Sequence, residues 1–87
     1  MTPGKRIERA HLARELLDNP MLREALERVE RKAIEDWRNT QWTDTATRET
    51  AYLRIRASAE LRRELELTVA DGAIARQDMS KIGRAHV

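Results

Sequence analysis

The 87-residue chain contains no cysteine and no phenylalanine, and it has only one tyrosine, two tryptophans and two prolines. The absence of cysteine excludes disulfides, thiolate nucleophiles and cysteine-ligated zinc. Few large aromatic side chains are available as core anchors, and a core built by so short a chain is marginal by itself. We therefore expect association with another chain to supply part of the stability.

Long apolar runs are also missing from the sequence. No stretch approaches the roughly 20 apolar residues that cross a bilayer, and the first residues lack the apolar segment of a signal peptide. The sequence therefore predicts a soluble cytoplasmic protein with no membrane partner.

The charge balance depends on residues 81–87, which read KIGRAHV. Translation of a common sequencing adapter gives a string that resembles these residues, so we interpret them as a non-native tail to be left out of fold reasoning. The whole chain has 17 Lys and Arg residues against 15 Asp and Glu. Removing Lys81 and Arg84 leaves 17 − 2 = 15 basic residues, so residues 1–80 are neutral.

Apolar residues recur every three or four positions, which predicts amphipathic helices. We expect an all-α fold with helices at about 5–17, 20–38 and 45–71 in one domain of residues 1–80. The first helix is short, and the other two form a long antiparallel helical hairpin that dimerises as a bundle. Asn19 before Pro20 and Asp44 are the expected N-caps, and Gly72 is the expected residue after the last helix.

The apolar stripes are the strongest signal in the chain, and they predict coiled-coil-like packing within the chain and against a second copy. Arg62 interrupts the apolar stripe of the predicted third helix. We expect its aliphatic stem to be buried while its guanidinium reaches an acidic residue. Trp42 lies in a polar turn, where it either packs over the turn or presents a recognition surface. The predicted packing and interface residues are Leu22, Leu26, Val29, Ala33, Trp37, Trp42, Tyr52, Ile55, Leu65 and Val69.

The sequence lacks the patterns that mark catalytic sites. There is no Gly-rich phosphate loop, no HExxH and no combination of serine, histidine and acid at a recognisable spacing. His11, the only histidine outside the tail, has no acidic pair at metal-ligand spacing. We therefore expect no enzyme activity, no metal and no cofactor.

Arginine is abundant, but basic and acidic residues alternate along each predicted helix. A nucleic-acid-binding domain usually has a basic stripe, so a nucleic acid is not the expected partner. If the chain does bind one, the densest basic patch offers Arg54, Arg56 and Arg63 as the surface.

Several local motifs lie between residues 14 and 75: LLDNP at 16–20, EDWRNT at 35–40, Asp44 followed by Arg48, and DGAIA at 71–75. With these motifs the chain resembles a group of small, mostly uncharacterised helical proteins of tailed bacteriophages and prophages. The resemblance implies a structural or head-assembly accessory role in a bacterial host cell. Phage structural proteins are then expected partners, virion association is an option, and no catalytic residue is implied. The alternatives are a small DNA-binding packaging or regulatory protein and an inhibitor of a host protein.

Overall fold

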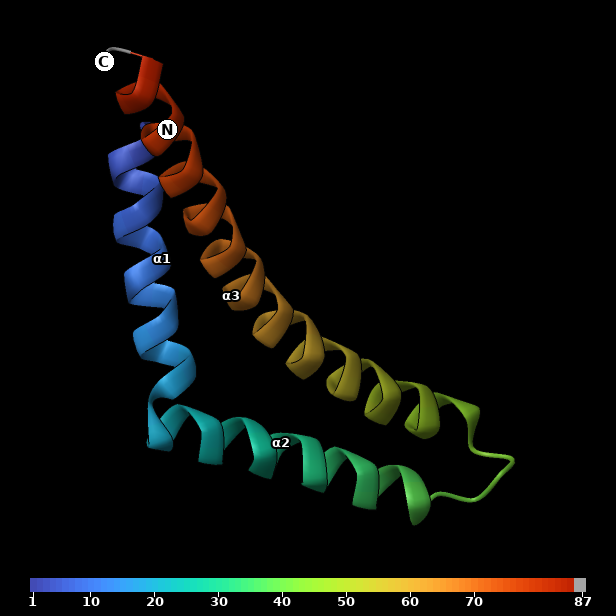
Figure 1. Cartoon of the computed structure of the whole chain (residues 1–87). Coiled ribbons are helices and arrows are strands. Elements are labelled where there is room, and N and C mark those ends of the chain that lie inside the picture. Colours follow the sequence, from blue (N-terminus) through green and yellow to red (C-terminus); the bar gives the residue numbers. More distant parts are fainter. Residues whose placement is uncertain (86–87) are drawn as a thin grey trace. The chain divides into compact units, whose positions relative to one another are not determined.

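The computed structural model describes the backbone of residues 1–85 and the side chains up to Lys81. This part of the chain is all-helical and contains no strand, which confirms the predicted fold class. Helix α1 spans Pro3–Asp18, α2 spans Pro20–Arg38, and α3 spans Thr45–Ala85 (Figure 1). In the suspected tail of residues 81–87, the backbone is described as far as Ala85 and the side chain only at Lys81.

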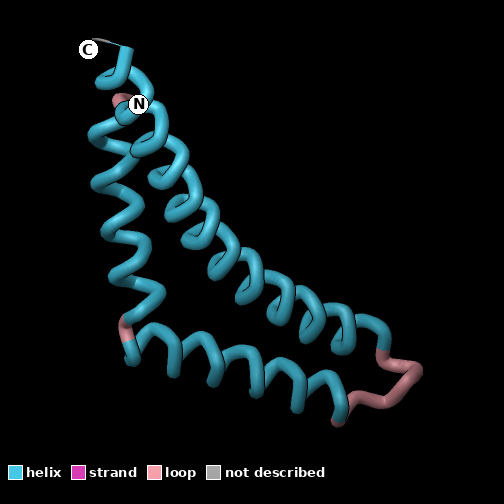
Figure 2. Tube along the Cα trace, in the orientation of Figure 1, coloured by secondary structure: helices cyan, strands magenta, loops and turns pink. Residues whose placement is uncertain are grey.

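The two breaks between helices lie where the capping residues predict them. Figure 2 shows the helical trace interrupted at residue 19 and again at residues 39–44. The Asn19 side chain accepts hydrogen bonds from the backbone N–H groups of Met21 (2.9 Å) and Leu22 (3.1 Å). Asp44 accepts one from the N–H of Thr47 at 3.2 Å. Both side chains satisfy N–H groups that have no partner within the helix.

The prediction that Gly72 ends the third helix is wrong, because α3 continues to Ala85. No described glycine has a positive φ angle, so Gly72 does not make the left-handed turn of a C-terminal cap. It is instead a point of close approach: a Cβ atom at Gly72 would overlap the Cβ of Ala10 on α1. Residues 75–85, which lie beyond the predicted end of this helix, are likewise helical.

The chain divides into two compact units. Unit 1 consists of Met1–Asp18 together with the chain from Arg63 onward, and unit 2 consists of Asn19–Arg62. Helix α3 contributes residues to both units. The predicted single domain of residues 1–80 stays a prediction.

The buried core consists almost entirely of small side chains. Among the residues whose burial is described, Leu26 is its only large member. Since interhelical distance depends on the side chains at the contact, small residues allow helices to approach closely. They also remove little apolar surface from water. The buried residues are Ala13, Gly72 and Ala75 in unit 1 and Leu26, Ala33, Ala51 and Ser58 in unit 2.

Candidate functional site

The candidate site lies in unit 2, around the loop of residues 39–44 between α2 and α3. The Thr40 hydroxyl donates a hydrogen bond to the Trp37 carbonyl at 2.7 Å, and the Thr40 N–H donates to the same oxygen at 3.3 Å. At the other end of the loop, the Asp44 N–H donates to the Gln41 carbonyl at 2.9 Å. These bonds give a short, polar loop a defined backbone.

Asp44 is held as a carboxylate at the start of α3. Hydrogen bonding by the Thr47 side chain, and then by the Thr47 backbone N–H, lowers the pKa of Asp44 below its usual value. This direction is the one expected where a carboxylate accepts hydrogen bonds at the positive end of a helix. The charge therefore stabilises the start of the helix.

Two ion pairs join α2 to the first part of α3. Arg54 Nη1 lies 2.8 Å from Asp36 Oδ2, and both side chains are only partly exposed. Arg62 Nη2 lies 3.8 Å from Glu30 Oε2, and Arg62 is half-buried. The charged head of Arg62 thus lies near an acid, as expected, while the burial of its stem stays a prediction.

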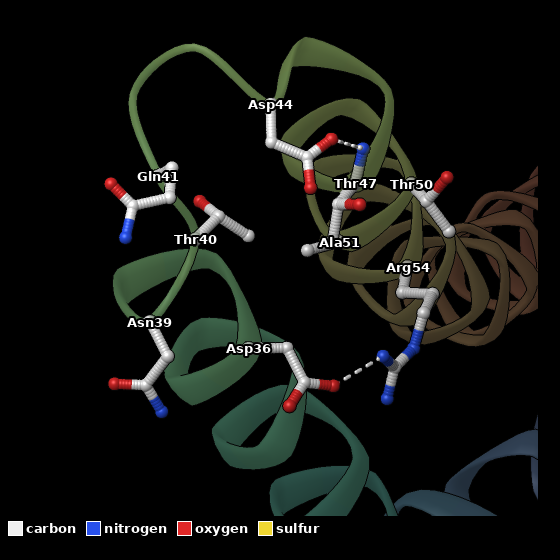
Figure 3. A pocket seen from close by; sticks show the side chains of 9 residues that line it. All are labelled: Asp36, Asn39, Thr40, Gln41, Asp44, Thr47, Thr50, Ala51 and Arg54. Carbon is white, nitrogen blue, oxygen red and sulfur yellow. Dashed lines mark hydrogen bonds and ion pairs between the residues drawn. The ribbon is translucent and has the colours of Figure 1, made fainter.

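The loop and the two helix ends enclose an open, polar hollow of about 380 Å³ (Figure 3). Both of its carboxylates are engaged, one with Arg54 and the other with Thr47. Amides and hydroxyls complete the wall, so the hollow offers donors and acceptors to a polar group of a partner. Its lining residues are Asp36, Asn39, Thr40, Gln41, Asp44, Thr47, Thr50, Ala51 and Arg54.

Trp37 carries a charged residue over its ring. The Arg48 guanidinium carbon lies 4.6 Å from the ring centroid, within the range of a cation–π interaction. Arg48 Nη1 also donates to the Thr40 hydroxyl at 3.5 Å. Trp42, in contrast, is 81% exposed. The two tryptophans therefore differ: one is ordered against α3, and the other projects from the loop.

The predicted packing and interface residues fall into three groups by burial. Leu26 and Ala33 are buried. The second group is half-buried: Leu22, Ile55, Leu65 and Val69. The third group is exposed: Val29, Trp37, Trp42 and Tyr52. Contact of this third group with a second copy of the chain stays a prediction.

The residues of the alternative nucleic-acid surface are partly neutralised. Arg54 pairs with Asp36. Arg56 Nη2 lies 3.6 Å from Glu60 Oε1. The pKa of the Arg56 guanidinium is raised, mainly by a hydrogen bond with Tyr52 and to a smaller extent by the charge of Glu60. Arg63 belongs to unit 1, while Arg54 and Arg56 belong to unit 2.

Sequence reasoning missed the ion pair that is shortest among the described residues, which lies in unit 1. Arg6 donates from Nη2 to Asp71 Oδ1 at 2.6 Å and from Nε to Oδ2 at 3.0 Å. Two parallel bonds of this kind are the favoured geometry for an arginine and a carboxylate. The partners are 65 residues apart, so no local spacing could have indicated them.

This pair predicts an acid-dependent loss of stability. Hydrogen bonding by Arg6 lowers the pKa of Asp71 in the folded chain. The stability that the Asp71 carboxylate contributes is therefore fully present above its ordinary pKa near 3.8. That stability is lost as the pH falls through the lower pKa of the folded chain. We expect Asp71→Asn to melt below the wild type at neutral pH and to converge with it in acid. Melting temperatures measured by circular dichroism from neutral to strongly acidic pH test this.

Glu66→Gln is the matched control, since it removes one exposed charge from the same helix and unit. It should leave the neutral-pH melting temperature close to that of the wild type. A gap between Asp71→Asn and wild type that persisted unchanged into strong acid would contradict this role for Asp71.

Within the described residues no group of three or more acidic or histidine side chains is placed to hold a metal ion. No helix in this part of the chain combines the length and apolarity needed to cross a bilayer. Comparisons with protein-family models, with curated proteins and with solved structures found no match.

Proposed function

We propose that this chain is a non-enzymatic accessory protein of phage or prophage particle assembly that acts through helix–helix contacts. In this proposal α2 and α3 form an antiparallel hairpin, and two copies associate as a bundle. The ion pairs Asp36–Arg54 and Glu30–Arg62 support the antiparallel pairing, because the residue number falls in α2 as it rises in α3.

The contrast between a small core and an apolar surface is the observation that carries the proposal. Among the described residues, Leu26 is the only large side chain in the core, while thirteen large apolar or aromatic side chains are exposed. Exposed apolar side chains mark an interaction surface where they form a contiguous patch, and the proposal requires part of this set to form one. They are Met1, Leu12, Leu16, Met21, Val29, Trp37, Trp42, Tyr52, Leu53, Leu61, Leu67, Ile74 and Met79.

Light scattering after gel filtration of the full chain, over a range of concentrations, tests the association. We expect a mass of twice 10.1 kDa that does not change when duplex DNA is added at low salt. Val29→Glu, at a predicted interface position, should shift the species toward the monomer. Ala57→Glu adds the same charge at another exposed helical position and should leave the mass unchanged.

A monomer at every concentration would overturn the dimer, and a shift produced only by DNA would favour the DNA-binding alternative. The genes beside the coding sequence test the biological setting separately. Neighbouring portal or terminase genes would support an assembly role, and a neighbouring repressor or integrase gene would favour regulation.

A further inference from the structure

A second hollow lies in unit 1, between α1 and α3, and three basic side chains line it. Its volume is about 210 Å³. His11 and Arg14 come from α1, three residues apart and therefore on one face of that helix. Arg76 comes from α3. The remaining lining residues are small or apolar: Ala10, Val69, Gly72 and Ala73.

The close approach of the two helices gives the hollow its floor. Gly72 leaves no room for a Cβ atom opposite Ala10, so at this point the two helices have almost no side-chain volume between them. The long basic side chains on either side can therefore converge over a narrow floor. None of the floor residues has a polar side chain that could accept hydrogen bonds from the N–H groups of these basic residues.

One hydrogen bond already orders this basic cluster. Arg76 Nη2 lies 3.3 Å from His11 Nε2. A guanidinium has donors only, so Nε2 accepts and the imidazole proton lies on Nδ1 in this arrangement. The remaining N–H groups of Arg76 and those of Arg14 are left for another acceptor.

No acid lines the hollow. Asp71 precedes Gly72, but Arg6 engages both of its carboxylate oxygens. Within the described residues, neither Arg14 nor Arg76 has a carboxylate within the 4.0 Å that defines an ion pair, although five other arginines do. Two positive charges thus face one hollow without a carboxylate of the described residues in ion-pair contact with either.

We propose that this hollow binds a phosphate dianion, either free or as a phosphomonoester, through Arg14, Arg76 and His11. The planar guanidinium forks match the oxygen geometry of phosphate and provide charge-assisted hydrogen bonds. Two arginine charges balance a dianion, and the Nδ1–H of His11 can donate to a phosphate oxygen after the ring turns. This site does not depend on the proposed assembly role, because it uses none of the predicted interface residues except Val69 in the floor.

The test is a titration of the full ¹⁵N-labelled chain with inorganic phosphate, followed through the backbone amides of Ala10, Gly72 and Ala73. Sodium chloride at equal ionic strength is the reference, and methyl phosphate distinguishes a monoester from the free ion. We expect saturable shifts at these amides with phosphate and not with chloride. Arg14→Gln and Arg76→Gln should each weaken binding about tenfold or more, the loss of one charged hydrogen-bond donor set.

Arg9→Gln is the matched control: it removes one arginine from the same exposed helix but not from the lining of the hollow. It should retain phosphate binding within about twofold, a change well below the tenfold step of 1.4 kcal/mol. Circular dichroism would establish that all three variants are equally helical. Equal weakening in all three, shifts that chloride reproduces, or a response to duplex DNA with none to phosphate would each overturn the proposal.

Discussion

The substitution Gly72→Ala is expected to lower the free energy of unfolding by about 1–3 kcal/mol, the usual cost of overpacking. In an ordinary helix interior the same change is stabilising by about 0.5–1 kcal/mol. The sign reverses because the new Cβ would overlap the Cβ of Ala10, which is attached directly to the backbone and cannot rotate away. Urea unfolding followed by circular dichroism measures the difference.

Gly4→Ala is the matched control, since nothing lies within 4 Å of a Cβ at Gly4. It should be neutral or stabilising. Adding Ala10→Gly to Gly72→Ala should recover stability, and a double-mutant cycle would measure the coupling between the two positions. If Gly72→Ala stabilised the chain as Gly4→Ala does, the close approach of α1 and α3 would be wrong.

Leu26→Ala is expected to cost about 2–5 kcal/mol, the range for removing a buried leucine side chain. Leu26 is 9% exposed and is the only large apolar residue in the described core. A chain of this length has a total stability of roughly 4–13 kcal/mol, so the loss is a large part of the whole. Chemical unfolding of the wild type and the variant under identical conditions gives the value.

Leu53→Ala removes the same atoms from a side chain that is 57% exposed. Its effect should stay within about 0.5 kcal/mol, as for most surface substitutions. Similar losses at Leu26 and Leu53 would mean that the burial of Leu26 does not set its contribution.

The sequence predicted those features that depend on neighbouring residues. Asn19 and Asp44 cap their helices through backbone groups two or three positions away, so the chemistry of each helix start is contained in a few residues. The helix breaks and the all-α class follow from the same short-range information.

Gly72 was wrongly predicted to follow the end of the third helix, because two different structural features favour glycine. A left-handed C-terminal cap needs its conformational freedom, while a close helix crossing needs the absence of its Cβ atom. Only the position of Ala10, 62 residues earlier in the chain, distinguishes the two. Sequence periodicity in α3 carries no information about that partner.

The core was predicted incompletely for a related reason. Large apolar residues dominate a periodicity search, yet Val29 and Tyr52 are exposed and Ala13, Ala51 and Ala75 are buried. Alanine is weakly apolar and common on helix surfaces, so its burial is decided by the neighbouring helix. Ser58, another small residue that a search for apolar periodicity passes over, is buried as well.

The distribution of aromatic residues between the units has a spectroscopic consequence. Trp37, Trp42 and Tyr52 all belong to unit 2, so the intrinsic fluorescence of the chain originates there and unit 1 has no fluorophore. Circular dichroism records helix in both units. Superimposable unfolding curves from the two methods would mean that the halves of the molecule melt as one cooperative system. Curves that separate would give the stability of each half from a single unlabelled sample.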